Sequence, residues 1–160
     1  LFSLKRLRNL DVKWEFTIIG GGPQENFLKK LSEDLKIQDK VIFKGTQPRD
    51  YVIEELLDHH VFILPSYSET LGLVYLESLA CGCITIGSKN EGIDGIIEDG
   101  RNGLLCDPND LDSITHKLHM AMTLSDSKRD QMIENALETA KSFTTEKKAQ
   151  DYLNQIKSFL

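Results

Sequence analysis

The sequence lacks any run rich in lysine and arginine, and acidic residues outnumber basic ones. Of its 160 residues, 25 are Asp or Glu and 19 are Lys or Arg, which gives a formal net charge of -6. A nucleic-acid partner requires a basic face that neutralises backbone phosphates. The composition therefore argues against such a partner, although a few backbone amides could still hold one small anionic ligand.

Long apolar runs are also missing, and cysteine is scarce. No apolar segment approaches the roughly 20 residues that a membrane-spanning helix needs, and the first ten residues lack the apolar core of a signal peptide. The only cysteines are Cys81, Cys83 and Cys106. An odd number cannot pair completely, and the single residue between the first two is unsuited to a zinc site. These features predict reduced thiols in a cytoplasmic protein.

Short apolar segments alternate with amphipathic ones along residues 14–107. Segments rich in β-branched and aromatic residues predict strands, and segments with apolar residues three or four apart predict helices. The predicted strands are Trp14–Ile19, Val41–Phe43, Val61–Leu64 and Ile84–Ile86, and the predicted helices are 24–37, one ending near Asp58, and Leu71–Ala80. Such alternation is typical of a parallel sheet covered on both faces. We therefore expect one α/β domain with a doubly wound parallel sheet, followed by a helical tail over residues 108–160.

Ligands of doubly wound sheets bind outside the carboxyl ends of the strands, where loops 20–23, 44–49, 65–72 and 87–95 would meet. The densest polar stretch is 66–77, in which Glu69 precedes a predicted helix and Glu77 lies inside it. Free N–H groups at the start of that helix, together with its dipole, suit a diphosphate. The alternative is purely structural: Glu69 would cap the helix, and Glu77 would form a surface salt bridge.

The run Glu69-x7-Glu77, followed by residues 78–82 and by Glu91-Gly92-Ile93, resembles the E-x7-E signature of glycosyltransferase family 4, whose members have the GT-B fold. Further resemblance lies in the Gly-rich turn after residues 14–19, in the loop at 43–45, in Pro65-Ser66 and in residues 99–105. The similarity covers about residues 14–110. It is a similarity to the C-terminal, donor-binding domain of that family, a Rossmann-like half of the GT-B fold.

The resemblance implies a role for each matching residue. Glu69 would contact the donor sugar as the catalytic residue, and Glu77 would bind the ribose. The other expected donor-binding residues are Thr70, Leu71, Gly72, Leu73, Gly20, Gly21, Gly22, Gly45 and Gln47. The family transfers a sugar, with retention of configuration, from a nucleotide-sugar such as a UDP-sugar to a glycan or lipid-linked acceptor. A hexosyltransferase that needs neither a metal nor another cofactor is the expectation.

The sequence departs from the family pattern in two places. The family's donor domain begins with a strand and a loop that carries an arginine and a lysine, whereas this sequence starts in the helix after that loop. We therefore expect that the first strand and the N-terminal acceptor domain are absent and that the isolated chain transfers no sugar. Asp94-Gly95 also stands where the family often has Pro-Glu.

Two other functions remain open at this stage: an inactive nucleotide-sugar-binding module with the same fold, and an enzyme that epimerises a nucleotide-sugar. A nicotinamide cofactor is disfavoured because the G-x-G-x-x-G pattern fails at Glu25.

The expected partners are the donor and the missing N-terminal domain of the same protein. The full-length enzyme could associate peripherally with the inner face of the membrane. A helical stripe of apolar residues in the tail predicts a dimer contact. Its members are Ala149, Tyr152, Leu153, Ile156 and Phe159.

Overall fold

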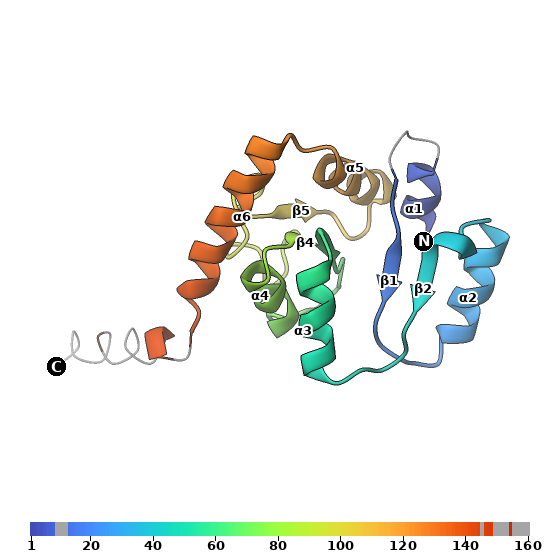
Figure 1. The fold of residues 1–160 in the computed structure, drawn as a ribbon, viewed down its shortest axis with the longest axis horizontal. Coiled ribbons are helices and arrows are strands. Elements are labelled where there is room, and N and C mark those ends of the chain that lie inside the picture. The colour runs from blue at the N-terminus through green and yellow to red at the C-terminus, as the bar shows by residue number, and fades with distance from the viewer. Residues whose placement is uncertain (9–12, 145, 149–153, 155–160) are drawn as a thin grey trace.

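The computed structural model describes residues 1–8, 13–144, 146–148 and 154. Short parallel strands lie between layers of helices, and the last helices run along one side of the molecule (Figure 1). The elements are α1 Phe2–Leu7, β1 Phe16–Ile18, α2 Glu25–Asp34, a 3-10 helix Gln38–Lys40, β2 Val41–Phe43, α3 Arg49–Asp58, β3 Val61–Ile63, α4 Leu73–Ala80, β4 Ile84–Ser88, β5 Leu104–Cys106, α5 Leu111–Met122 and α6 Asp126–Lys141.

The strands form two parallel sheets, one with the order β1-β2 and one with the order β3-β4-β5. Phe16 lies opposite Val41 in the first sheet. In the second sheet Val61 lies opposite Ile84, and Ile86 lies opposite Leu104. Because all pairs are parallel, the carboxyl ends of the strands within each sheet open onto one edge, where the connecting loops gather.

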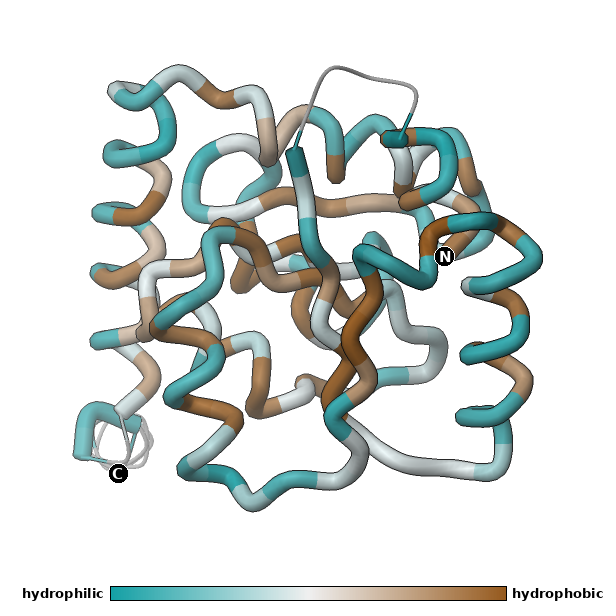
Figure 2. Tube along the Cα trace, turned by 45° about the vertical axis from the view of Figure 1, so that its right-hand side comes forward, coloured by the Kyte–Doolittle hydropathy of each residue, from teal (hydrophilic) through white to brown (hydrophobic). Residues whose placement is uncertain are grey.

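The three-stranded sheet is buried on both faces. Leu104 and Cys106 of β5 pack in a cluster with residues of α1 and α5, whereas Leu105 packs in a second cluster with Tyr75 and Leu79 of α4. Side chains alternate between the faces of a strand, so β3 and β5 each contribute to both clusters. Figure 2 shows the same arrangement, with apolar segments in the interior and polar segments on α2 and α6. The α/β doubly wound fold is thus confirmed.

Most predicted elements are present, with differences at their ends. The first strand covers only Phe16–Ile18, and β5 was not predicted as a strand. Helix α4 begins at Leu73 rather than at Leu71, because Gly72 has a φ of 64°, which lies outside the helical region. The three cysteines are free, and burial raises the pKa of the Cys83 and Cys106 thiols to about 11.

The residues after the sheet are helical as far as they are described. Helix α5 begins at an Asp110 cap whose side chain accepts a hydrogen bond from the Asp112 N–H, and α6 packs along α4. No helix within these described ranges is both long and apolar enough to cross a membrane. The apolar stripe predicted from Ala149 to Phe159 lies outside the described residues.

The burial of β4 leads to a testable difference in stability. Ile86 is 0% exposed between the two neighbouring strands, whereas Ile42 of β2 is 38% exposed. We expect Ile86→Ala to lower the free energy of unfolding by about 2–5 kcal/mol through lost contacts and a cavity. Ile42→Ala should cost less than about 1 kcal/mol. Urea unfolding of the two variants compares these values, and equal losses would contradict the assignment of β4 to the core.

Candidate functional site

The candidate site lies at the carboxyl ends of the strands, where the loop before α4 meets the loop after β4. The Glu69 N–H donates to the Glu91 side chain over 2.9 Å, and the Gly92 N–H donates to the Glu69 carbonyl over 3.0 Å. The backbones of these two loops approach so closely that a Cβ added to Gly92 would lie 1.3 Å from the carbonyl oxygen of Thr70. Glycine is therefore required at 92, and the backbone of Glu69 is fixed from both sides.

Gly72 brings the Glu69 carboxyl group to the start of α4. A Cβ added to Gly72 would lie 3.3 Å from the Glu69 carboxyl carbon and 2.9 Å from the ring of Tyr75. Glu69 does not cap α4, because the N-cap residue is Gly72 and no side chain of the described residues forms a capping hydrogen bond there. The structural alternative for Glu69 is therefore wrong. Its carboxylate lies instead beside the first turn.

The later start of α4 changes which amides belong to its first turn. Thr70 and Leu71 precede the helix and do not supply first-turn N–H groups, contrary to the prediction. Leu73 is the first helical residue and is 70% exposed. The free N–H groups at this helix end therefore begin at Leu73, and Thr70 and Leu71 belong to the loop in front of it.

Buried hydrogen bonds hold α4 in place under the loop. The Tyr75 hydroxyl donates to the Leu64 carbonyl just after β3, and the Tyr75 ring is fully buried. Burial raises the pKa of this phenol, so the hydroxyl remains a donor at neutral pH. The hydroxyls of Ser78 and Thr85 lie 2.7 Å apart and join α4 to β4. The N-terminal end of α4 is thus fixed relative to the strand ends.

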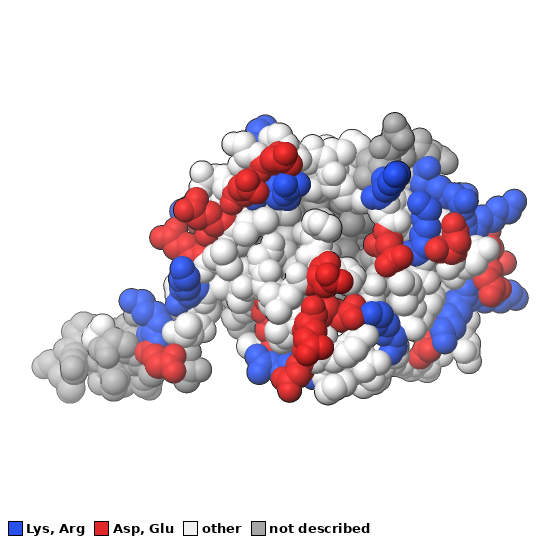
Figure 3. Space-filling view, in the orientation of Figure 1, with Lys and Arg blue, Asp and Glu red and all other residues white. Residues whose placement is uncertain are grey.

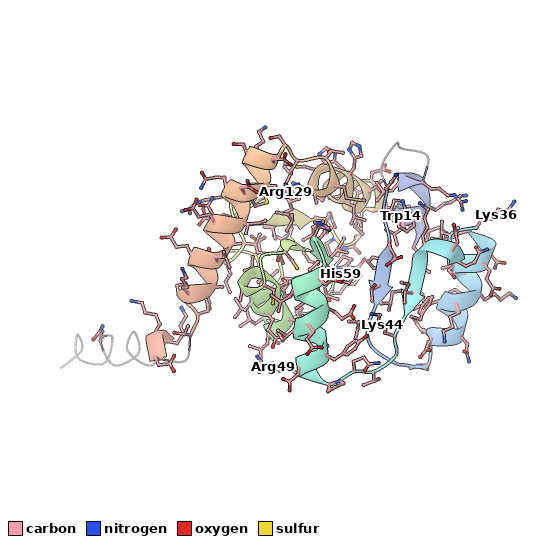
Figure 4. The ribbon with its side chains drawn as sticks, in the orientation of Figure 1. Trp14, Lys36, Lys44, Arg49, His59 and Arg129 are labelled. Atoms are coloured by element: carbon pink, nitrogen blue, oxygen red, sulfur yellow. The ribbon has the colours of Figure 1, made fainter. Side chains whose placement is uncertain are left out.

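Glu77 forms an ion pair with Arg49, the first residue of α3. The Arg49 Nε donates to the Glu77 Oε1 over 2.6 Å, which confirms the alternative that Glu77 takes part in a salt bridge. The Glu77 side chain is only 15% exposed, whereas that of Arg49 is 76% exposed. Figure 4 shows Arg49 at the lower end of α3. An exposed arginine on a long side chain exchanges its partner at little cost. The carboxylate is therefore fixed by its helix, and the guanidinium is free to move.

The glycines predicted at the site gather at the other sheet. The Gly20 N–H donates to the Gly45 carbonyl over 2.8 Å, so the turn after β1 contacts the loop after β2. A cavity of about 380 Å³ adjoins this contact and is lined by Ile18, Gly20, Gly21, Gly22, Pro23, Gln24, Glu25, Leu28 and Phe43. The Gln47 amide donates to the Lys44 carbonyl over 2.6 Å, so this donor is used within its own loop.

The predicted residues thus form two groups. Glu69, Thr70 and Gly72 lie together before α4, and Gly20–Gly22 lie with Gly45. The Arg49–Glu77 pair connects α4 to the start of α3, which follows the loop that carries Gly45 and Gln47. No hydrogen bond between described residues joins the Gly20–Gly22 turn to Glu69.

Two residues of the site were not assigned a role from the sequence. Glu91 belongs to the Glu91-Gly92-Ile93 motif, but its side chain accepts a hydrogen bond from the N–H of Glu69, which lies 22 positions earlier in another loop. The sequence pattern around Arg49 did not indicate a role at the site, because its ion-pair partner, Glu77, lies 28 positions away.

The charges around the site limit how an anion could be held. Acidic side chains lie over α3 in Figure 3, and three exposed ones repeat four residues apart: Asp50, Glu54 and Asp58. Lysine and arginine side chains gather instead over α1 and α2. A phosphate at α4 would depend on backbone N–H groups and on Arg49. The two carboxylates are acceptors suited to the paired hydroxyls of sugars.

Solved structures share this fold at low sequence identity. A glycosyltransferase from Rickettsia africae aligns with a TM-score of 0.84 at 20% identity, covering 98% of this chain and 42% of that one. The Anabaena protein Alr3699/HepE, solved in complex with UDP-glucose, aligns with a TM-score of 0.82 at 19% identity, covering 98% and 43%. These likenesses establish the fold and no more.

Curated relatives show a closer sequence match over part of their length. N-acetyl-alpha-D-glucosaminyl L-malate synthase of Bacillus anthracis is 37% identical over 100 residues, which cover 62% of this chain and 26% of that protein. A GDP-mannose-dependent alpha-(1-6)-phosphatidylinositol monomannoside mannosyltransferase of Mycolicibacterium smegmatis is 33% identical over 124 residues, covering 71% and 31%. The chain thus spans about a third or less of these relatives. Residues 1–139 match the profile of the family described as glycosyl transferases group 1, and the chain belongs to that family.

Proposed function

We propose that the chain is the nucleotide-sugar-binding domain of a retaining glycosyltransferase of family 4, placed in the C-terminal half of a GT-B enzyme. The full enzyme transfers a hexose from a nucleotide-sugar to a glycan or lipid-linked acceptor, and it requires no metal at this site. The observation that carries the proposal is the arrangement at α4. Glu69 lies beside the first turn, and Glu77 lies one turn further along the helix.

Each carboxylate has a separate task in this proposal. Glu69 is the catalytic residue and accepts hydroxyl groups of the donor sugar, while Glu77 accepts the two ribose hydroxyls after Arg49 moves aside. Backbone amides from Thr70 to Leu73 hold the diphosphate, with Arg49 as a nearby cation. Gly20–Gly22, Gly45 and Gln47 border the nucleotide. One named relative is GDP-mannose-dependent and one structural neighbour was solved in complex with UDP-glucose, so the base remains to be measured.

The acceptor side belongs to a separate N-terminal domain, so the isolated chain binds donor without transferring sugar. In this proposal the full enzyme works in the cytoplasm, at the inner face of the membrane when its acceptor is a lipid. The Arg49–Glu77 ion pair does not favour an inactive module, because the arginine is exposed and its pair is readily broken.

Nucleotide binding tests the role of Glu77. We expect Glu77→Gln to weaken binding of one nucleotide-sugar class by about 10–100-fold, because a charge-assisted hydrogen bond to the ribose is lost. Ligand-observed NMR against UDP-, GDP- and ADP-sugars measures this effect and identifies the base. The exposed Glu54→Gln is the matched control and should bind like the parent. A 2′,3′-dideoxy nucleotide should bind parent and Glu77→Gln equally.

Arg49→Gln tests whether the Glu77 carboxylate contacts the ribose itself or affects nucleotide binding only through its ion pair with Arg49. This variant removes the ion pair and the cation near the diphosphate but keeps the carboxylate. It should weaken binding less than Glu77→Gln does, and to the same extent for ribose-containing and 2′,3′-dideoxy nucleotides. If Arg49→Gln and Glu77→Gln weaken binding equally, and the dideoxy nucleotide shows the same loss, the carboxylate does not contact the ribose.

Turnover tests Glu69 in the longer protein that carries the acceptor domain. We expect Glu69→Gln to lower kcat by at least about 100-fold, because the carboxylate acts on the reacting sugar, while donor affinity changes less. Glu98→Gln, at an exposed ion pair with Arg101, should keep full turnover. NMR of the product should show the donor's anomeric configuration. An inverted product would contradict the retaining mechanism, and no turnover in the parent would favour the inactive module.

A further inference from the structure

Residues 90–94, in the loop after β4, form a closed turn. The Asp94 N–H donates to the Glu91 carbonyl over 2.8 Å, and the Asn90 N–H donates to the Asp94 Oδ2 over 2.7 Å. The first is the backbone hydrogen bond of a β-turn. In the second, an aspartate side chain accepts from a nearby backbone N–H, which restrains the turn further. Both bonds end at Asp94, so this residue closes the turn. We call residues 90–94 the clasp loop.

The clasp loop begins with a backbone conformation that needs support. Asn90 has a φ of 61°, in the left-handed region that costs free energy for any residue with a Cβ, although less for asparagine than for most. The Asp94 carboxylate accepts a hydrogen bond from the N–H of this same residue. Because the acceptor is ionised, the bond is stronger than one between neutral groups. It therefore stabilises the left-handed conformation at the start of the loop.

Ile93 anchors the clasp loop to the core. Its side chain is fully buried and packs in the same cluster as Tyr75 of α4. A Cβ added to Gly87 of β4 would lie 2.7 Å from the Ile93 side chain, so the loop is also packed tightly against this strand. Asp94, in contrast, is exposed. Its hydrogen bonds, rather than its burial, therefore hold the polar part of the loop in shape.

The clasp loop presents two groups to the backbone of Glu69. The Glu91 carboxylate accepts the Glu69 N–H over 2.9 Å, and the Gly92 N–H donates to the Glu69 carbonyl over 3.0 Å. Glu91 and Gly92 both lie within the turn that Asp94 closes. Asp94 itself forms no hydrogen bond to Glu69 in the described part of the chain. Its effect on the Glu69 backbone therefore passes through Glu91 and Gly92.

We propose that Asp94 is a positioning residue for Glu69 and acts through the clasp loop. Its two hydrogen bonds hold Glu91 and Gly92 where they bond to the Glu69 backbone, and the Glu69 carboxylate thereby keeps one position beside the first turn of α4. This inference rests on the proposed catalytic role of Glu69. Misplacing a reacting group by about 1 Å can cost about 100-fold in rate, so a residue that does not touch the substrate controls turnover in this way.

Amide exchange in this chain tests the coupling. We expect Asp94→Ala to speed exchange of the Glu69 and Gly92 amide protons by at least about tenfold, because a charge-assisted bond is lost and the loop opens more often. Asp94→Asn keeps a side-chain oxygen acceptor and should change both rates by less than about threefold. Asp34→Ala, at an exposed position of α2, is the matched control. The Ile86 amide in β4 reports global stability and should keep its rate. Solvent-exchange NMR measures all four amide samples.

Turnover in the longer protein that carries the acceptor domain tests the consequence. Asp94→Ala should lower kcat by about tenfold or more while the KM for the donor changes by less than about threefold. Asp94→Asn should keep most of the parent's kcat. In a Glu69→Gln background, Asp94→Ala should lower kcat no further, because it acts only through Glu69. A merely structural role would lower kcat by the same factor in both backgrounds.

Three results would overturn the proposal. The first is unchanged exchange at Glu69 and Gly92 in Asp94→Ala, and the second is an equal effect of Asp94→Asn and Asp94→Ala. The third is the same loss of kcat in the parent and Glu69→Gln backgrounds. The catalytic role of Glu69 fails separately, when Glu69→Gln alone keeps full turnover. If the longer protein shows no turnover, the exchange rates in this chain decide whether Asp94 positions Glu69.

Discussion

The arrangement of the molecule depends on the burial of β4 between two parallel neighbours. All five of its residues are buried, and its ladders to β3 and β5 place the carboxyl ends of the three strands side by side. Both faces of a buried parallel strand must be covered, so α4 packs on one side, α1 and α5 pack on the other, and α6 contributes to both clusters. The loop after β4 starts from this fixed point, and its position determines that of Glu69.

The site's two carboxylates are held in different ways. Glu69 sits in a loop whose backbone is bonded to Glu91 and Gly92, so its position depends on the contact between two loops. Glu77 is carried by a helix that Tyr75 and Ser78 anchor to the strands. Its ion pair with Arg49 is therefore a contact that a ligand could replace without moving the helix. Rigid carboxylates are suited to accepting hydrogen bonds from the hydroxyl groups of a ligand, and the exchangeable cation is suited to a negatively charged part of it.

Much of the fold follows from local pattern. The β-branched runs at 61–63 and 84–86 identified β3 and β4, and the spacing of apolar residues identified the helices. Strand β5 was missed because three apolar residues in a turn-rich stretch carry little periodic signal. The start of α4 was misplaced because Gly72 has a φ of 64°, a left-handed backbone conformation that the spacing of apolar residues does not record.

The sequence alone determined the alternation of most strands and helices and the E-x7-E run, because each depends on residues close together in the chain. Only the tertiary structure decided that Arg49 pairs with Glu77 and that Glu91 holds Glu69. These features join segments from different loops and strands. Their partners are selected by how the sheets and helices pack, and no local propensity records that choice.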